Sequence, residues 1–247
     1  EMTVTVLAGT TVSELHTELE KHGQRTCLPD RGGTIGGAIA VGENDLNMLG
    51  KGRIRDSVLQ LRYVSAGGEI ITSGAPVVKN VSGFNLHKLM VGSFGTLGLF
   101  AEVSLRTNPI PPSSRWLTAA SKDPQKVFDN VYKPSAILWD GETVWVHLEG
   151  HRLDVEKQTK KLLNIGNYEE IEGAPGLPRY RWSLSPSDAI KIDRNETGNF
   201  VASIGVGIVW ADRQQPQKAI DPVVTKITTA LKTEFDPCGR LNPGRHI

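Results

Sequence analysis

Eleven residues near the end of the chain constrain its fold more than any other segment. They read FDPCGRLNPGR over residues 235–245 and place a proline and a glycine on each side of Asn242. Proline fixes φ, and glycine allows positive φ and the close approach of other atoms. This composition predicts a rigid turn at a terminus, where chains ordinarily fray. We therefore expect the tail to pack against another part of the molecule, although a helix stop followed by a surface turn fits these residues equally well.

Composition and charge exclude several classes of partner. The 247 residues suffice for one or two domains, and 28 basic against 27 acidic residues leave a net charge of +1. This balance predicts no nucleic-acid partner and no binding to anionic lipid. No apolar run approaches the ~18 residues of a membrane span. The two cysteines, Cys27 and Cys238, form no metal or disulfide pattern, which fits a reducing compartment and predicts a cytoplasmic protein.

A proline-rich segment, NPIPPSS at residues 108–114, is the clearest domain boundary in the sequence. We predict one domain over residues 1–110, a second over 114–220, and a helix and tail over 221–247 that return to the first. The expected strands are 2–7, 58–64, 69–72 and 99–106 in the first domain and 116–119, 137–139, 143–148, 180–184 and 200–210 in the second.

Local signals place the turns and helices between these strands. Thr11 and Glu14 have the spacing of a capping box, and Asp123 followed by Pro124 marks another helix start. The pair Asp140-Gly141 predicts a tight hairpin. The β-α-β-β-α-β order of the second domain predicts a compact α+β module with an antiparallel sheet.

A glycine-rich loop, RGGTIGG at residues 31–37, leads into a short apolar run. Glycines expose consecutive backbone N–H groups, and a helix that begins there adds the positive end of its dipole. Both features suit a phosphate or pyrophosphate, with the Thr34 hydroxyl as a further donor. A tight turn without a ligand is the alternative, since this loop is neither a P-loop nor a dinucleotide fingerprint.

A second glycine-rich loop, GSFGTLG at residues 92–98, enters the strand at Leu99. Three positions without side chains allow the backbone to approach a flat ligand closely. The segment KNVSG at residues 79–83 precedes it, and each of these segments alone is also consistent with an ordinary turn.

Taken together in their order along the chain, these segments resemble the pattern of one protein family. The succession TIGG (34–37), KNVSG (79–83), LMVGSFGTLG (89–98) and DPCGRLNPGR (236–245) resembles the flavoproteins of the p-cresol methylhydroxylase/vanillyl-alcohol oxidase type. Among them it is most similar to the FAD-binding E subunits of glycolate oxidase. The resemblance covers residues 1–110 and 221–247 and is thin between them.

The resemblance implies an α+β fold, namely a partial FAD-binding domain of this type with an inserted antiparallel α+β cap. It implies FAD as the cofactor, with the pyrophosphate on the first glycine loop, the adenine beside Gly98 and Phe100, and the flavin end near Asn242. Gly36→Val is then expected to displace the cofactor while the fold is kept. The residues that the resemblance places on FAD are Pro29, Thr34, Ile35, Gly36, Gly37, Ala40, Gly42, Gly98, Phe100 and Asn242.

The sequence departs from the family pattern in two respects. The family's first pyrophosphate loop precedes the strand at residues 2–7, whereas this chain opens at Glu1 without it, which predicts an N-terminal truncation. The His-Gly-rich motif that related dehydrogenases carry in the cap is also missing. His147 and His151 are four residues apart across a predicted strand end, so we predict no metal site, and the catalytic residues stay unknown.

The leading interpretation is an FAD-dependent oxidoreductase subunit of a glycolate or other 2-hydroxy-acid oxidase complex. Its implied partners are a flavin-containing D-type subunit and an iron–sulfur F-type subunit, in the cytoplasm or held at the inner membrane through those subunits. Two alternatives stay open: a stand-alone FAD-dependent alcohol or lactate oxidoreductase, and a non-catalytic scaffold that has lost FAD.

Overall fold

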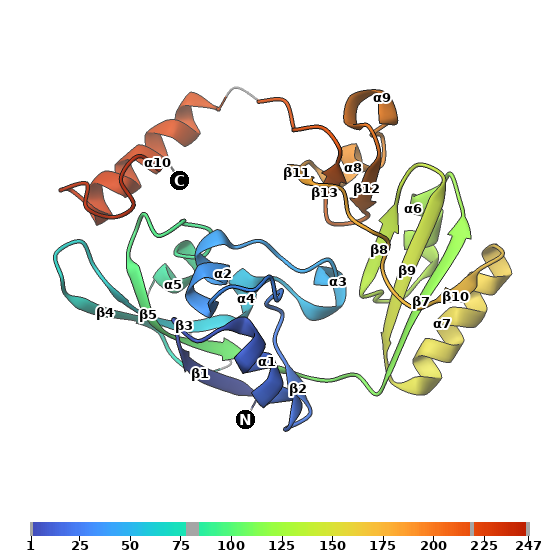
Figure 1. Cartoon of the computed structure of the whole chain (residues 1–247), viewed down its shortest axis with the longest axis horizontal. Coiled ribbons are helices and arrows are strands. Elements are labelled where there is room, and N and C mark those ends of the chain that lie inside the picture. Colours follow the sequence, from blue (N-terminus) through green and yellow to red (C-terminus); the bar gives the residue numbers. More distant parts are fainter. Residues whose placement is uncertain (1, 78–83, 218–219, 246–247) are drawn as a thin grey trace. The chain divides into compact units, whose positions relative to one another are not determined.

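The computed structural model describes residues 2–77, 84–217 and 220–245, which form two compact units (Figure 1). Unit 1 contains Glu1–Asp45, Gly52–Ile110 and Ala219–Ile247, and unit 2 contains Leu46–Lys51 and Pro111–Lys218. The short segment Leu46–Lys51 therefore belongs to the second unit, although the sequence places it inside the first domain. The predicted KNVSG segment lies outside the described residues.

Unit 1 is built on a four-stranded antiparallel sheet with strand order β1-β5-β3-β4. The strands of this sheet are β1 (Thr3–Leu7), β3 (Val58–Val64), β4 (Ile70–Gly74) and β5 (Leu99–Arg106), while β2 (Gln24–Arg25) and β6 (Asn108–Pro109) form a separate antiparallel pair. The helices of unit 1 are α1 (Val12–Glu20), α2 (Ile35–Val41), α4 (Ile54–Ser57), α5 (Leu86–Leu89) and α10 (Pro222–Phe235). The predicted first-domain strands and the hairpin of β3 and β4 are confirmed.

The core of unit 1 forms where α1 and α2 pack on the sheet. The Thr11–Glu14 capping box is present in full and begins α1. Ile35 and Ile39 lie one helical turn apart on α2, and both are fully buried in the same cluster as Tyr63 of β3. Burial of each such isoleucine contributes about 1.5–3 kcal/mol, which fixes α2 on the sheet.

Unit 2 is a seven-stranded antiparallel sheet with strand order β10-β7-β9-β8-β12-β13-β11. Its strands are β7 (Ser113–Ala120), β8 (Ala136–Trp139), β9 (Thr143–Gly150), β10 (Glu169–Ile171), β11 (Tyr180–Ser183), β12 (Phe200–Ser203) and β13 (Ile208–Ala211), and its helices are α3 (Met48–Lys51), α6 (Pro124–Asn130), α7 (Arg152–Ile165), α8 (Pro186–Ala189) and α9 (Arg194–Thr197). Side chains from α6, α7 and α8 share one core with the sheet. The α+β class with an antiparallel sheet is thus confirmed.

The predicted single strand at residues 200–210 is wrong, because the chain turns in its middle. β12 and β13 pair antiparallel, and Gly205 and Gly207 between them have φ of 79° and 86°. The Gly207 N–H donates to the Ser203 carbonyl at 3.2 Å and closes the turn. Glycine adopts these angles without strain, so two glycines inside an apolar run were the available turn signal.

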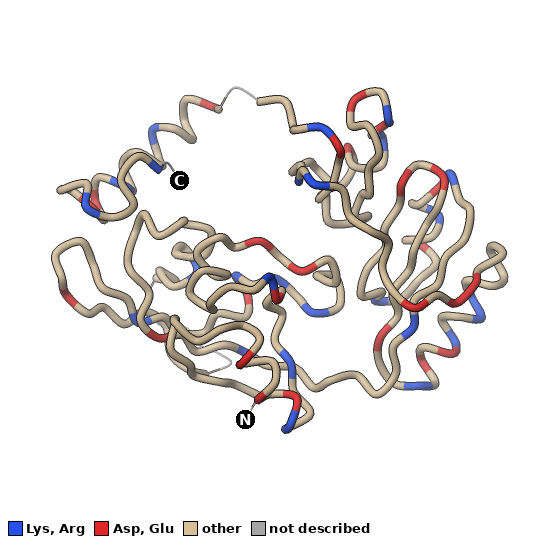
Figure 2. The backbone as a smooth tube through the Cα atoms, viewed as in Figure 1, with Lys and Arg blue, Asp and Glu red and all other residues tan. Residues whose placement is uncertain are grey.

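Basic and acidic side chains are interspersed in each unit, as along α7 (Figure 2). Among the described residues, no helix has the length and apolar character that would let it span a membrane.

Candidate cofactor-binding site

Helix α2 and its preceding loop form the first part of the site. Thr34 is the N-cap of α2, and its hydroxyl accepts the Gly37 N–H at 3.2 Å. The N–H groups of Ile35 and Gly36 donate to the carbonyls of Thr10 and Ala8, at 2.9 and 2.8 Å. From the sequence we expected these N–H groups to be free to bind a phosphate. In the structure they instead hold α2 against the segment that follows β1.

The N–H groups that stay open lie slightly earlier in the chain. Among the described residues, those of Gly33 and Thr34 have no hydrogen-bond acceptor. A cavity of ≈ 180 Å³ lies beside Gly33. It is lined by Val12, Pro29, Arg31, Gly33, Gly37, Ala38, Val41 and Glu43. Of the predicted cofactor residues, Pro29 and Gly37 line this cavity directly.

Gly36 and Gly37 have different physical roles. A Cβ on Gly36 would lie 2.9 Å from the Ala8 Cβ, and Gly36 does not have positive φ. Gly36 is therefore required for packing against β1, and we expect Gly36→Val to disturb the fold as well. A Cβ on Gly37 would meet only the Thr34 hydroxyl, at 3.3 Å, so Gly37 faces the open side of α2.

The second glycine loop joins the C-terminal end of α2. Gly92 and Phe94 donate their N–H groups to the carbonyls of Ile39 and Ala40, at 3.0 and 2.8 Å. Gly42 ends the helix with φ of 68°, and a Cβ there would lie 2.9 Å from the backbone of Gly92. The two loops that the sequence singled out, some fifty residues apart, therefore meet at one short helix.

Ser93 in this loop carries a buried hydroxyl with no partner. The side chain is 1% exposed, and its Oγ has no hydrogen-bond partner among the described residues. A buried hydroxyl without a partner costs about 1–3 kcal/mol. Because this Oγ is also inaccessible from the surface, it offers no contact to a cofactor in this structure. Ser93 was not among the residues predicted from the sequence. Its unpartnered hydroxyl is recognised only from its burial in the folded chain.

The tail returns to the same loop. The Asn242 side-chain amide donates to the Phe94 carbonyl at 2.6 Å, and the Arg245 guanidinium lies 4.2 Å from the centre of the Phe94 ring. Lys232 of α10 donates to the carbonyls of Thr96 and Leu241, at 3.0 and 2.6 Å. The tail is thus ordered by contacts with the second glycine loop.

Asp236 holds the turn that produces this arrangement. Its carboxylate accepts hydrogen bonds from Lys232 Nζ at 2.6 Å and from the N–H groups of Arg240 and Leu241, at 2.9 and 2.7 Å. The Lys232 hydrogen bond, with the two backbone donors, lowers the pKa of Asp236 from 3.8 to about 2. The carboxylate is therefore ionised over the physiological range.

The remaining predicted residues lie deeper. Gly98 is buried, and a Cβ there would lie 2.6 Å from the ring of Tyr63, while Phe100 is partly buried against the core. A second cavity of unit 1, of ≈ 460 Å³, lies between the β3–β4 hairpin and the segment at Pro237 and Cys238. Gly98 and Asn242 line neither of these two cavities, so the predicted common cleft is not a single described cavity.

Comparison with known proteins places this geometry in a family. Residues 1–74 match the FAD binding domain family FAD_binding_4. The whole chain is similar to glycolate oxidase subunit GlcE of Escherichia coli (strain K12), with 28% identity over 99% of this chain and 82% of that one. Residues 1–74 therefore match an FAD-binding domain, and the chain as a whole is similar to an FAD-binding oxidoreductase subunit. The predicted cofactor, FAD, and the predicted class, an FAD-dependent oxidoreductase, are confirmed.

Other flavoproteins of this type match parts of the chain. D-2-hydroxyglutarate dehydrogenase of Xanthomonas citri pv. viticola is 36% identical over 48% of this chain, which spans 26% of that protein. Glycolate oxidase subunit GlcD of Bacillus subtilis (strain 168) is 41% identical over 35% of this chain and 18% of its own length. The solved structure of alkyldihydroxyacetonephosphate synthase covers 99% of this chain and 65% of its own, with a TM-score of 0.70 and 15% identity, and so shows the shared fold.

The residues of this flavoprotein fit a dinucleotide. Gly33 and Gly37 leave bare backbone beside a cavity, and Thr34 between them is exposed at the N-cap of α2. FAD needs such backbone and hydroxyl donors for its diphosphate, because that group carries negative charge and accepts hydrogen bonds. Thr34 carries the hydroxyl group that we expect to hold it.

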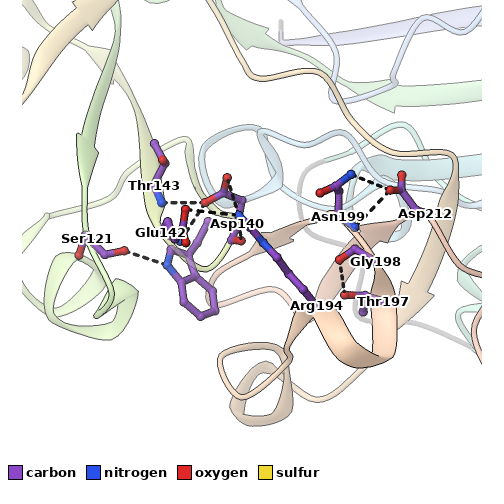
Figure 3. A network of polar contacts seen from close by, with 10 residues as sticks. Ser121, Asp140, Glu142, Thr143, Arg194, Thr197, Gly198, Asn199 and Asp212 are labelled. Atoms are coloured by element: carbon purple, nitrogen blue, oxygen red, sulfur yellow. Dashed lines mark hydrogen bonds and ion pairs between the residues drawn. The ribbon is translucent and has the colours of Figure 1, made fainter.

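Polar contacts in unit 2 of the flavoprotein are structural (Figure 3). Asp140 caps the hairpin turn by accepting the N–H groups of Glu142 and Thr143, at 3.0 and 2.7 Å. Arg194 of α9 lies 3.7 Å from the carboxylates of both Asp140 and Glu142, and Asn199 donates to Asp212. Such exposed pairs stabilise weakly, and here they fasten α9 to the hairpin.

His147 of unit 2 is buried and hydrogen-bonded. Its Nε2 lies 2.8 Å from the Ser114 hydroxyl, its Nδ1 lies 2.7 Å from Asn47 Oδ1, and its ring stacks on Trp116. His151 instead caps the first turn of α7. The two histidines thus act separately, and among the described residues no group of three His, Cys, Asp or Glu side chains could hold a metal ion.

Gly37→Val tests the exposed side of α2. We expect the variant to keep its thermal unfolding temperature to within a few degrees, because the new Cβ would contact the Thr34 hydroxyl alone, at 3.3 Å, on an otherwise open side of α2. We expect FAD affinity to fall by at least tenfold, since the valine would occupy the cavity beside the open N–H groups. Flavin fluorescence titration checks this, and wild-type affinity in the folded variant would contradict it.

Proposed function

We propose that this chain is the FAD-binding subunit of a multi-subunit oxidase of glycolate or a related 2-hydroxy acid. The observation that carries the proposal is the extent of similarity to GlcE, which runs through both units. The D-2-hydroxyglutarate dehydrogenase matches under half of the chain. Since a shared fold alone does not select a function, similarity that extends across both units favours a subunit of the GlcE kind.

In this proposal unit 1 is the FAD-binding domain and unit 2 is the cap. When bound, FAD supplies the two-electron acceptor for the hydroxy acid. The chain's own residues bind and orient it: Gly33 and Thr34 do so through their N–H groups, and Asn242 does so by holding the second glycine loop in place. Pro29, Ile35, Gly36, Ala40, Gly42, Gly98 and Phe100 complete the proposed set by shaping α2, its loops and the start of β5.

The proposed electron path leaves this subunit through an iron–sulfur partner, with a D-type flavin subunit in the same complex. The similarity of this chain to both GlcE and GlcD supports an assembly of related subunits. The similarity to dehydrogenases that carry other substrate names favours a stand-alone oxidoreductase as the second candidate.

Co-expression distinguishes the two candidates. The tagged chain is expressed with its cognate D-type and iron–sulfur subunits, purified, and assayed for glycolate-dependent reduction of an acceptor dye. We expect all three chains to purify together, and the complex to reduce the dye while the isolated chain does not. Dye reduction by the isolated chain would favour the stand-alone enzyme, and failure of the chains to purify together would contradict the proposed assembly.

A further inference from the structure

An ion pair lies at the edge of the cavity beside α2. Arg31 Nη1 lies 2.7 Å from Glu43 Oε2, and both side chains line the cavity of ≈ 180 Å³. Arg31 comes from the loop before α2 and Glu43 from the residue after its C-cap, so the pair spans the helix from end to end. The two residues were not part of the predicted cofactor set.

The Arg31 guanidinium lies at a cavity whose wall includes backbone without side chains. Gly33 and Gly37 line the same cavity, and a Cβ on Gly33 would meet no atom within 4 Å. The other walls, such as Val12 and Val41, are apolar and add no charge. Arg31 is therefore the one positively charged side chain among the residues that line this cavity.

The pair contributes little to the stability of the fold. The Arg31 side chain is 51% exposed and that of Glu43 is 24% exposed. Exposed ion pairs have a median contribution near zero, because solvent screens the attraction and both side chains lose freedom. A guanidinium, in contrast, forms paired charge-assisted hydrogen bonds with phosphate oxygens. Replacing the Glu43 carboxylate by a phosphate at Arg31 therefore costs little free energy.

We propose that Arg31 binds the diphosphate of FAD and that Glu43 positions the guanidinium at the cavity until the cofactor arrives. This inference rests on the proposed function, because it assigns a residue to the cofactor of that site. Glu43 competes with the diphosphate for the same guanidinium. The pair therefore sets the FAD affinity of this chain and makes it sensitive to ionic strength.

Three variants test the proposal by equilibrium titration of FAD, followed by flavin fluorescence at low and at high ionic strength. Arg31→Gln is expected to bind FAD about tenfold more weakly at low ionic strength, as the loss of one half-exposed charge-assisted contact implies, and to lose part of the salt dependence. Glu43→Gln is expected to bind FAD more tightly than the wild type. Arg55→Gln is the matched control, since Arg55 is exposed in unit 1 and does not line the cavity.

The outcomes separate the inference from the function on which it rests. If Arg31→Gln binds FAD as the wild type does, or if Glu43→Gln weakens binding as much as Arg31→Gln, Arg31 does not bind the diphosphate. A merely structural pair would give the second result, because both variants would break the same contact. If the folded wild-type chain binds no FAD, the proposed function fails together with the inference.

Discussion

Gly42→Ala is expected to destabilise unit 1 by about 2–4 kcal/mol and to abolish measurable FAD binding. Gly42 has φ of 68°, where an L side chain is strained, and a Cβ there would lie 2.9 Å from both the N and the Cα of Gly92. Those atoms are backbone and cannot rotate away. The second glycine loop would have to move from α2, and the Ser93 hydroxyl would move with it.

Chemical denaturation and FAD titration measure the two effects separately. Gly9→Ala is the control for stability, because Gly9 lacks positive φ and a Cβ there would meet no atom within 4 Å. We expect that variant to stay within about 0.5 kcal/mol of the wild type. Full FAD affinity in Gly42→Ala would show that the contact between α2 and the second loop is irrelevant to the cofactor.

Asp236→Asn is expected to loosen the tail and to weaken FAD binding strongly. The substitution removes the charge that binds Lys232, and Lys232 also holds the Thr96 carbonyl of the second glycine loop. An asparagine cannot reproduce the carboxylate, because its amide nitrogen is a donor and would face either the Arg240 N–H or the Leu241 N–H and Lys232 Nζ.

The pH dependence of the Asp236 variant follows from the lowered pKa. The folded state holds the pKa of Asp236 at about 2, below its ordinary 3.8. The stabilisation is therefore complete above about pH 4 and is lost as the pH falls through 2. The unfolding temperature of Asp236→Asn should lie below that of the wild type at pH 7, and the difference should shrink between pH 4 and pH 2.

An exposed aspartate provides the comparison. Asp56 lies in the first turn of α4 and is exposed, so Asp56→Asn should alter neither FAD affinity nor the acid limb of the stability curve. If Asp236→Asn and Asp56→Asn give the same profiles, the tail is not held by the Asp236 carboxylate.

Local signals predicted the parts of the fold that depend on neighbouring residues. The capping box at Thr11, the proline-started helix after Asp123 and the hairpin at Asp140-Gly141 are all present. The run from Phe200 to Trp210 was misread as one strand, because its apolar side chains hide a turn that two glycines make.

The sequence predicted which segments form the site. It did not predict the hydrogen bonds that those segments make. Glycine content identified both loops, and order along the chain identified the family. The sequence could not show that Ile35 and Gly36 use their N–H groups within the protein, because their acceptors lie more than twenty residues earlier, at Thr10 and Ala8. The unpartnered Ser93 hydroxyl is likewise a property of tertiary burial.

Hydrogen–deuterium exchange of the chain with and without FAD tests the central claim most directly. The proposal is that the first glycine loop binds the cofactor, while the second glycine loop packs against α2 and the tail packs against the second loop. It predicts that FAD slows exchange at residues 31–42, 92–98 and 239–245 at the same ligand concentration. Protection confined to one of these three segments, or absent from all of them while FAD is bound, would contradict it.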